Sequence, residues 1–194
     1  MTEPTILVPG FMDNKRTLRS LVMHLEQQGL QPHAVSPQPS TGEVGIEELA
    51  AQLRDYIVEN FAPEQSLNLV GFSMGGLICR SYVQQLGGAA RTKRLIAVAT
   101  PHRGTLSAFI YNRVAAHQMR PGSAFLQELN RDLSSLQQLQ FTTIWTPLDL
   151  TILPASSALL PVGNTVSVLS PFHGVMLFDP QVMRAIAQKL REGQ

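Results

Sequence analysis

The sequence contains little cysteine, little charge and no long hydrophobic run. Its one cysteine, Cys79, excludes an internal disulfide and a multi-cysteine metal site. Charged residues make up 15% of the chain, against about 25% in an average soluble domain. The net charge of +1 lacks the basic surplus of a nucleic-acid-binding protein, so no nucleic-acid partner is expected. No apolar run approaches the roughly 20 residues that a membrane-spanning helix needs.

Targeting and metal-binding signals are also lacking. The N-terminal sequence MTEPTILVPG has neither the basic nor the apolar region of a secretory signal, which predicts a cytoplasmic protein. The five histidines are scattered and lack metal-ligand spacing, so we expect no metal and no other cofactor. Hydrophobic residues, by contrast, make up 44% of the 194 residues, which suits one globular domain over residues 1–194.

Short β-favouring runs alternate with segments of helical periodicity. The first seven predicted elements are strand 5–8, a helix around 18–25, strand 33–35, helix 45–60, strand 67–70, helix 76–86 and strand 94–99. Residues 106–139 read as helical, and strands 141–146 and 165–169 and helix 182–190 follow, with Asp179 as N-cap and Pro180 at the first helical position. The alternation predicts an α/β fold with a mostly parallel central sheet and helices on both faces.

One pentapeptide carries a catalytic signature. Residues 71–75 read GFSMG and fit G-x-S-x-G, between the predicted strand 67–70 and the helix from residue 76. This is the strand–turn–helix setting of a nucleophile elbow, in which the glycines allow the strained turn that presents Ser73. The alternative interpretation is a serine that caps a helix after a glycine turn.

A serine nucleophile needs a base, and the base needs an orienting acid. Asp149 directly follows the predicted strand 141–146 and is the only charged residue between Asp132 and Asp179. A lone carboxylate in so apolar a stretch needs a partner such as an imidazole, so Asp149 is the candidate acid. Asp179 is the alternative acid, although a helix-capping role already explains it.

The candidate base is His173, which lies after the predicted strand 165–169 and before the last helix. The chain order serine, acid, histidine fits this choice, whereas the alternative base His102 precedes Asp149 and is interpreted as structural or as part of the cleft wall.

The oxyanion of an acyl-transfer reaction would be held by the backbone N–H of Met74 and by that of Phe11, in the loop after the first strand.

Taken together, these segments resemble the α/β-hydrolase superfamily, and within it the small bacterial lipases and esterases of the triacylglycerol lipase type. Residues 6–11 resemble the first strand and oxyanion loop, residues 71–76 the elbow, and residues 100–105 the Thr-Pro-His-x-Gly-Thr segment. Residues 121–126 are similar to a segment of lipases that carry a short lid. Residues 149–156 resemble the acid loop, and His173 with the following glycine fits the base loop.

The resemblance implies a minimal α/β-hydrolase fold with a short helical, lid-like insertion over about residues 105–139. Two positions depart from the family pattern, which usually has His where Pro9 stands and His or Tyr where Phe72 stands. Neither departure removes a member of the Ser73, Asp149 and His173 set, and both bear on the surrounding hydrogen bonds.

The predicted function is therefore that of a serine carboxylic-ester hydrolase, a lipase or esterase. Acyl lipids are the expected substrates, and transient contact with a membrane surface would suit them. The alternatives are a thioesterase or acyltransferase acting on lipid or acylated substrates, and an inactive hydrolase-fold protein that binds a ligand. The expected substrate-binding side chains, all apolar and close to the site in sequence, are Phe11, Met12, Phe109, Met119, Leu153, Phe172 and Met176.

Overall fold

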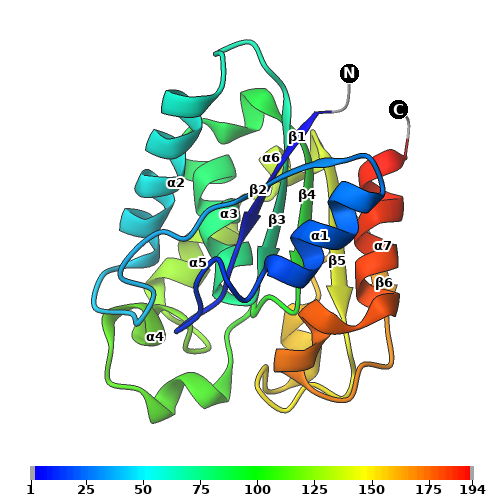
Figure 1. The fold of residues 1–194 in the computed structure, drawn as a ribbon. Coiled ribbons are helices and arrows are strands. Elements are labelled where there is room, and N and C mark those ends of the chain that lie inside the picture. Colours follow the sequence, from blue (N-terminus) through cyan, green and yellow to red (C-terminus); the bar gives the residue numbers. More distant parts are fainter. Residues whose placement is uncertain (1–2, 193–194) are drawn as a thin grey trace.

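A single parallel sheet organises the protein. The computed structural model describes residues 3–192 (Figure 1). Its strands are β1 (Pro4–Val8), β2 (Gln31–Ala34), β3 (Leu67–Phe72), β4 (Thr92–Val98), β5 (Gln140–Trp145) and β6 (Asn164–Ser167). They form one sheet in the order β2-β1-β3-β4-β5-β6, and every neighbouring pair is parallel. All carboxyl ends of the strands therefore lie at one edge of the sheet, the lower edge in Figure 1.

Helices cover both faces of the sheet. They are α1 (Arg19–Gln27), α2 (Ile46–Asn60), α3 (Met74–Gln85), α4 (Val114–Gln118), α5 (Ala124–Arg131), α6 (Ser134–Gln137) and α7 (Pro180–Arg191). In Figure 1, α2 and α3 lie on one face and α1 and α7 on the other. The predicted α/β architecture with a parallel sheet between helices is confirmed.

The core has two halves because side chains alternate along each buried strand. In β1, Ile6 packs into the cluster under α2 and α3, whereas Leu7 packs into the cluster under α1 and α7. In β3, Leu69 packs into the cluster under α2 and α3, and Val70 packs into the cluster under α1 and α7. Both faces of the central strands are thus apolar, and polar chemistry is left to the loops at the strand ends.

The segment from residue 106 to 139 is less helical than its sequence predicts. It consists of the short 3-10 helix η2 (Leu106–Ile110) followed by α4, α5 and α6, none longer than eight residues. Between α4 and α5 the chain turns at Gly122, which has a φ of +78°. At Asp132 the backbone is extended, which ends α5. The apolar residues of this segment are spaced as in separate short helices that face one core, and not as in one continuous helix.

Buried hydrogen bonds fasten this segment to the sheet. Arg80 of α3 is fully buried and donates from Nη2 to the Leu129 carbonyl at 2.9 Å and to Asn130 Oδ1 at 3.0 Å. Its Nη1 lies 3.2 Å from Nδ1 of His102, and Asn130 Nδ2 donates to the His102 carbonyl at 2.8 Å. Burial lowers the pKa of the Arg80 guanidinium to about 9. Helix α5 is therefore held against α3 and against the loop after β4.

His102 is held neutral in this cluster. Burial, and secondarily the positive charge of Arg80, lower the pKa of its imidazole well below the usual value. Its side chain is wholly buried and does not line the cavity described below, so of the two interpretations offered from the sequence the structure supports a structural residue rather than part of the cleft wall.

We expect this neutral histidine to make the folded protein less stable in acid. The unfolded chain protonates the imidazole near pH 6.5, whereas the folded protein resists protonation there. Because the unfolded state then binds more protons, the free energy of unfolding falls as the pH falls below 6.5. The His102→Asn variant keeps an acceptor for Arg80 and does not titrate. Between pH 7 and pH 5, we expect the free energy of unfolding of this variant to fall by about 2 kcal/mol less than that of the wild type, measured by urea unfolding.

His117, which is exposed, supplies the control for this measurement. The His117→Gln variant should keep the acid dependence of the wild type. An acid dependence of His102→Asn equal to that of the wild type would contradict the assignment of a buried neutral imidazole.

Candidate active site

Ser73 occupies a strained turn between β3 and α3. Its backbone has φ 54° and ψ −122°, a region that residues with a side chain rarely adopt. The Ser73 N–H donates to the Val98 carbonyl at the end of β4 at 2.8 Å, which ties the turn to the neighbouring strand. Ser73 stands at the N-cap position of α3, as the helix-cap alternative expects, but its side chain makes no capping hydrogen bond to the helix.

The glycines of the motif are required by close backbone contacts. A Cβ atom on Gly71 would lie 2.5 Å from the carbonyl oxygen of Gly75. A Cβ atom on Gly75 would lie 2.3 Å from the carbonyl oxygen of Val8, at the end of β1. These approaches bring the start of α3 directly against β1, and the loop after β1 therefore passes beside Ser73.

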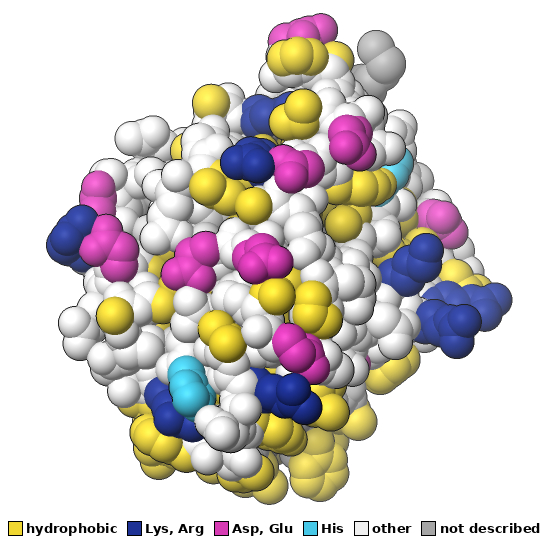
Figure 2. All heavy atoms as spheres, turned by 90° about the vertical axis from the view of Figure 1, so that its left-hand side faces the viewer, with side chains coloured by type: hydrophobic (Ala, Val, Ile, Leu, Met, Phe, Trp, Pro, Cys, Tyr) yellow, Lys and Arg dark blue, Asp and Glu magenta, His cyan; other side chains and the backbone are white. Residues whose placement is uncertain are grey.

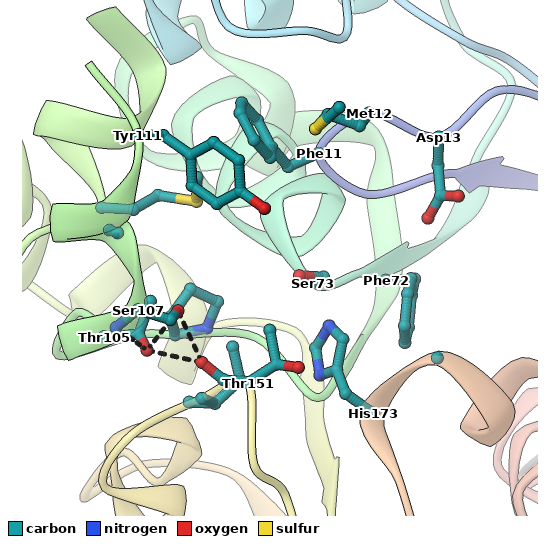
Figure 3. Close-up of a pocket in the computed structure, with 15 residues that line it drawn as sticks. Phe11, Met12, Asp13, Phe72, Ser73, Thr105, Ser107, Tyr111, Thr151 and His173 are labelled. Carbon is teal, nitrogen blue, oxygen red and sulfur yellow. Dashed lines mark hydrogen bonds between the residues drawn. The ribbon is translucent and has the colours of Figure 1, made fainter. Parts of the chain in front are cut away.

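A cavity of about 200 Å³ opens at this edge of the sheet (Figure 3). Ser73 and His173 both line it. Its other lining residues are Phe11, Met12, Asp13, Phe72, Pro101, Thr105, Ser107, Ala108, Tyr111, Met119, Thr151, Ile152 and Gly174. They come from the loops after β1, β3, β4, β5 and β6, so the cavity is built by the chain segments that leave the carboxyl ends of the strands.

His173 is paired with a buried carboxylate. Its Nδ1 lies 2.8 Å from Oδ2 of Asp149, which is only 4% exposed. The other oxygen, Oδ1, accepts the backbone N–H groups of Thr151 and Ile152, each at 2.8 Å. Since the carboxylate accepts, Nδ1 carries the proton, and Nε2 is left as an acceptor. Figure 3 shows the imidazole beside Ser73.

Hydrogen bonds between loops fix the position of this pair. Thr146 Oγ1, at the end of β5, donates to the Ser170 carbonyl of the following loop at 2.8 Å. From the other side, the hydroxyl groups of Thr105 and Ser107 both donate to the Thr151 carbonyl at 2.7 Å. The loops that carry Asp149 and His173 are thus tied to each other and to the start of the lid-like segment.

Two backbone donors beside Ser73 have no hydrogen-bond partner among the described residues. Met74 is the first residue of α3, so its N–H is one of those that a helix leaves unpaired. Among the described residues, the Phe11 N–H also has no hydrogen-bond partner. The loop is fixed one residue later, where the Met12 N–H donates to the Ser40 carbonyl at 2.9 Å. The two predicted oxyanion donors therefore lie on segments that both adjoin Ser73.

The structure places three of the seven predicted substrate-binding residues around the cavity. Phe11, Met12 and Met119 line it, whereas the remaining four predicted residues do not. Those four are Phe109, Leu153, Phe172 and Met176. Met176 is fully buried in the core under α1 and α7, because the 3-10 helix η4 (His173–Phe178) turns it inward.

Phe109, Leu153 and Phe172 lie at the outer surface of their segments. Phe109 is 57% exposed and packs under the guanidinium of Arg120, whose Cζ lies 4.8 Å from the ring centroid. Phe172 is also 57% exposed, and Leu153 is 36% exposed. Sequence proximity to the site did not reveal the direction of these side chains.

Several lining residues have no counterpart in the sequence-based prediction. Asp13, Thr105, Ser107, Tyr111 and Thr151 add polar groups to a cavity expected to be apolar. The position of Asp13 directly after the predicted oxyanion loop was a usable signal. The alternative acid Asp179 lies elsewhere and caps α7 by accepting the Gln181 N–H at 2.8 Å.

The fold, with a serine on a strained strand–helix turn and a histidine–carboxylate pair at the same edge, is that of the α/β-hydrolases. The sequence matches the family model of palmitoyl protein thioesterases over residues 4–132, about two thirds of the chain. The protein belongs to this family and is an ester-hydrolysing enzyme. The match includes Ser73 and ends before Asp149 and His173.

Solved structures share the fold at low sequence identity. Bacillus licheniformis lipase BlEst2 in its mature form has a TM-score of 0.81 and 13% identity, over 97% of this chain and 92% of that chain. Aspergillus fumigatus lipase B has a TM-score of 0.78 and 16% identity, over 96% of this chain and 52% of that chain. An extracellular α/β-hydrolase from a Paenibacillus species has a TM-score of 0.68 and 14% identity, over 96% and 97%. Among curated proteins, none matches the sequence significantly.

Two further features of the described residues concern membranes and metals. Across residues 3–192, no helix is both long and apolar enough to traverse a bilayer. The same residues include no group of three or more histidine, cysteine or carboxylate side chains placed to hold a metal ion.

Proposed function

We propose that the protein is a serine carboxylic-ester hydrolase with Ser73 as nucleophile, His173 as base and Asp149 as orienting acid. The observation that carries this proposal is the His173–Asp149 pair at 2.8 Å, whose histidine lines the same cavity as a serine held at positive φ. The unpaired N–H groups of Phe11 and Met74 complete the set of groups that acyl transfer needs.

Each group has a defined task. Nε2 of His173 takes the Ser73 hydroxyl proton while Oγ attacks the acyl carbon, and the N–H groups of Phe11 and Met74 hold the oxyanion. Asp149 stabilises the imidazolium that forms. His173 then gives the proton to the leaving alcohol, which departs and leaves an acyl ester on Ser73. Water attacks this ester, His173 takes its proton, and collapse of the second tetrahedral intermediate releases the acid and restores Ser73.

Acyl lipids are the substrates that the surroundings of the site favour. One wall of the cavity consists of Phe11, Ala108, Tyr111 and Met119, and the Phe11 and Tyr111 rings meet edge to face at 5.1 Å. Such a wall suits an acyl chain.

Around the cavity mouth lies what we call the apolar rim. Among residues 3–192, fifteen large hydrophobic residues are exposed, and thirteen of them lie in segments that follow the carboxyl ends of β1, β4, β5 and β6. They are Met12, Leu106, Phe109, Ile110, Tyr111, Val114, Leu148, Leu150, Leu153, Leu169, Phe172, Val175 and Phe178. Figure 2 shows hydrophobic side chains gathered along the lower edge of the α2 side. We propose that this rim contacts the surface of a lipid phase during turnover.

The apolar rim predicts a difference between emulsified and dissolved substrates. Ile110 is 79% exposed and Leu150 is 67% exposed. Serine buries much less apolar surface in a lipid phase than isoleucine or leucine does. The double variant Ile110→Ser/Leu150→Ser should therefore hydrolyse an emulsified triacylglycerol about tenfold more slowly than the wild type. Its rate on dissolved p-nitrophenyl acetate should change less than twofold. Val58→Ser, at a 65% exposed site on α2, is the matched control, and an equal loss in that variant would contradict the proposal.

Thioester hydrolysis is the second candidate function. The observation that favours it is the match to the palmitoyl protein thioesterase family. The same serine, histidine and oxyanion donors serve either bond, because both reactions pass through an ester of the acyl group on Ser73.

One experiment tests both candidates. The purified protein is assayed with p-nitrophenyl esters from acetate to palmitate and with the acyl thioesters of matching length. A fluorophosphonate that phosphonylates active serines is then added, and the labelled peptide is identified by mass spectrometry. We expect turnover of at least one series, complete inhibition at one label per chain, and the label on Ser73. Turnover that survives labelling, or a label on another residue, would overturn the proposal.

A further inference from the structure

Asp13 introduces a charge into the candidate active site that the proposed reaction does not use. Of the 15 described residues that line the cavity, Asp13 is the only aspartate or glutamate, and none of these residues is lysine or arginine. Asp149, the other carboxylate of the site, is buried behind His173 and does not line the cavity. The space next to the nucleophile thus carries the formal charge of one carboxylate.

This carboxylate lies close to the nucleophile. The point where a Cβ atom on Gly10 would stand is 3.1 Å from Cβ of Ser73 and 3.3 Å from Oδ2 of Asp13. The same point is 3.3 Å from Cδ1 of Phe72. The absence of a side chain at Gly10 therefore brings the serine, the carboxylate and the aromatic ring together around one small space.

The negative charge of Asp13 has no cationic partner among the described residues. Its Oδ1 accepts the hydroxyl of Thr17 at 3.1 Å, and no ion pair within residues 3–192 includes it. Lys15 and Arg16 follow closely in the sequence, yet both side chains are exposed and neither reaches the carboxylate. The charge is therefore available to a bound molecule.

The position of Asp13 assigns it to the leaving-group side of the cavity. His173, which must protonate the leaving group, packs against Phe72 with ring centroids 4.9 Å apart. Figure 3 shows Asp13, Phe72 and His173 on one side of Ser73, and Phe11 and Tyr111 on the other. The apolar wall fits the acyl chain, so the leaving group lies beside the carboxylate and the Phe72 ring.

We propose that Asp13 selects substrates whose leaving alcohol or thiol carries a positive charge, such as an ammonium group. A carboxylate beside an aromatic ring attracts a cation by charge and by the ring quadrupole. The same carboxylate repels a leaving group that carries phosphate or carboxylate. This inference rests on the proposed serine-hydrolase function and names the chemistry of the leaving group for it.

A pair of esters of equal shape tests the proposal. Butyrylcholine carries a quaternary ammonium, and 3,3-dimethylbutyl butyrate has the same acyl chain and a carbon in place of the nitrogen. We expect the wild type to show a kcat/KM at least about tenfold higher for butyrylcholine at low salt. The ratio should decrease at 0.5 M NaCl because salt screens the partly exposed charge. In Asp13→Asn the ratio should fall to about one.

Two further variants separate the charge from its surroundings. Asp13→Glu keeps the charge and should retain most of the preference, whereas a role limited to loop structure would not be rescued in this way. Asp55→Asn makes the same charge change at an exposed site on α2 and should keep the wild-type ratio.

The outcomes distinguish this inference from the function on which it rests. A wild-type ratio near one, or a ratio unchanged in Asp13→Asn, would overturn the role of Asp13 while leaving the hydrolase intact. Equal losses on both esters in Asp13→Asn would indicate a structural role and would also overturn it. If the wild type hydrolysed neither ester nor any member of the p-nitrophenyl series, the proposed function itself would fail, and this inference with it.

Discussion

Replacing Ser73 by alanine is expected to lower kcat for ester hydrolysis by up to about 10⁶-fold, the loss measured for the nucleophile of a serine triad. The cause is the loss of the acyl-enzyme pathway, since the variant lacks the hydroxyl of the proposed nucleophile. The rate is measured with p-nitrophenyl butyrate, and the folded state is checked by circular dichroism.

A matched control accompanies this prediction. Ser134 is exposed at the start of α6, and Ser134→Ala should retain the wild-type rate. Equal rates in Ser73→Ala and the wild type would mean that the turnover arises at another site or from background hydrolysis.

Replacing Asp149 by asparagine is expected to lower kcat by about 10⁴-fold. The asparagine carbonyl can still accept the N–H groups of Thr151 and Ile152, so the loop keeps its shape. Its amide NH₂ would face Nδ1 of His173 and favour the tautomer with the proton on Nε2. That proton would then point toward Ser73, and the imidazole could no longer accept from the hydroxyl.

The alternative acid gives the control for Asp149. Asp179→Asn preserves a good N-cap for α7, because asparagine caps helices about as well as aspartate. It should keep nearly the wild-type rate. A large loss in Asp179→Asn together with a small loss in Asp149→Asn would reverse the assignment of the orienting acid.

Much of the fold could be predicted from the sequence because each central strand is short, apolar and followed by a helical segment. The alternation of strand and helix predicted the parallel sheet, and Asp179 followed by Pro180 predicted the start of α7. The end of β3 was less clear. Gly71 was expected to end the strand, but it pairs with Ala97 of β4 inside the sheet. The reason is the close approach of α3, which demands glycine within the strand itself.

The proposed nucleophile, acid and base were accessible to sequence reasoning because each lies in the segment that follows a strand, and parallel strands bring such segments to one edge. The side-chain directions in the irregular segments were not accessible. The buried Met176 and the exposed Phe172 both lie near His173, in a stretch too short and irregular to show a period. The position of Asp13 in the cavity depends on the path of the loop after β1. This path is set by a positive φ at Met12 and by the hydrogen bond from the Met12 N–H to the Ser40 carbonyl.

The order of strands in the sheet has a consequence for how activity is lost. Ser73 follows β3, which is buried along its whole length and has a neighbour on each side. His173 follows β6, a four-residue strand at the edge of the sheet that is bonded only to β5 and largely exposed. Edge strands open more easily than central ones, so we expect amide hydrogens of β6 to exchange with solvent through openings that leave β3 closed. The proposed base is therefore carried by one of the two edge strands of the sheet, and we expect inactivation by denaturant to report partial opening at β6 rather than global unfolding.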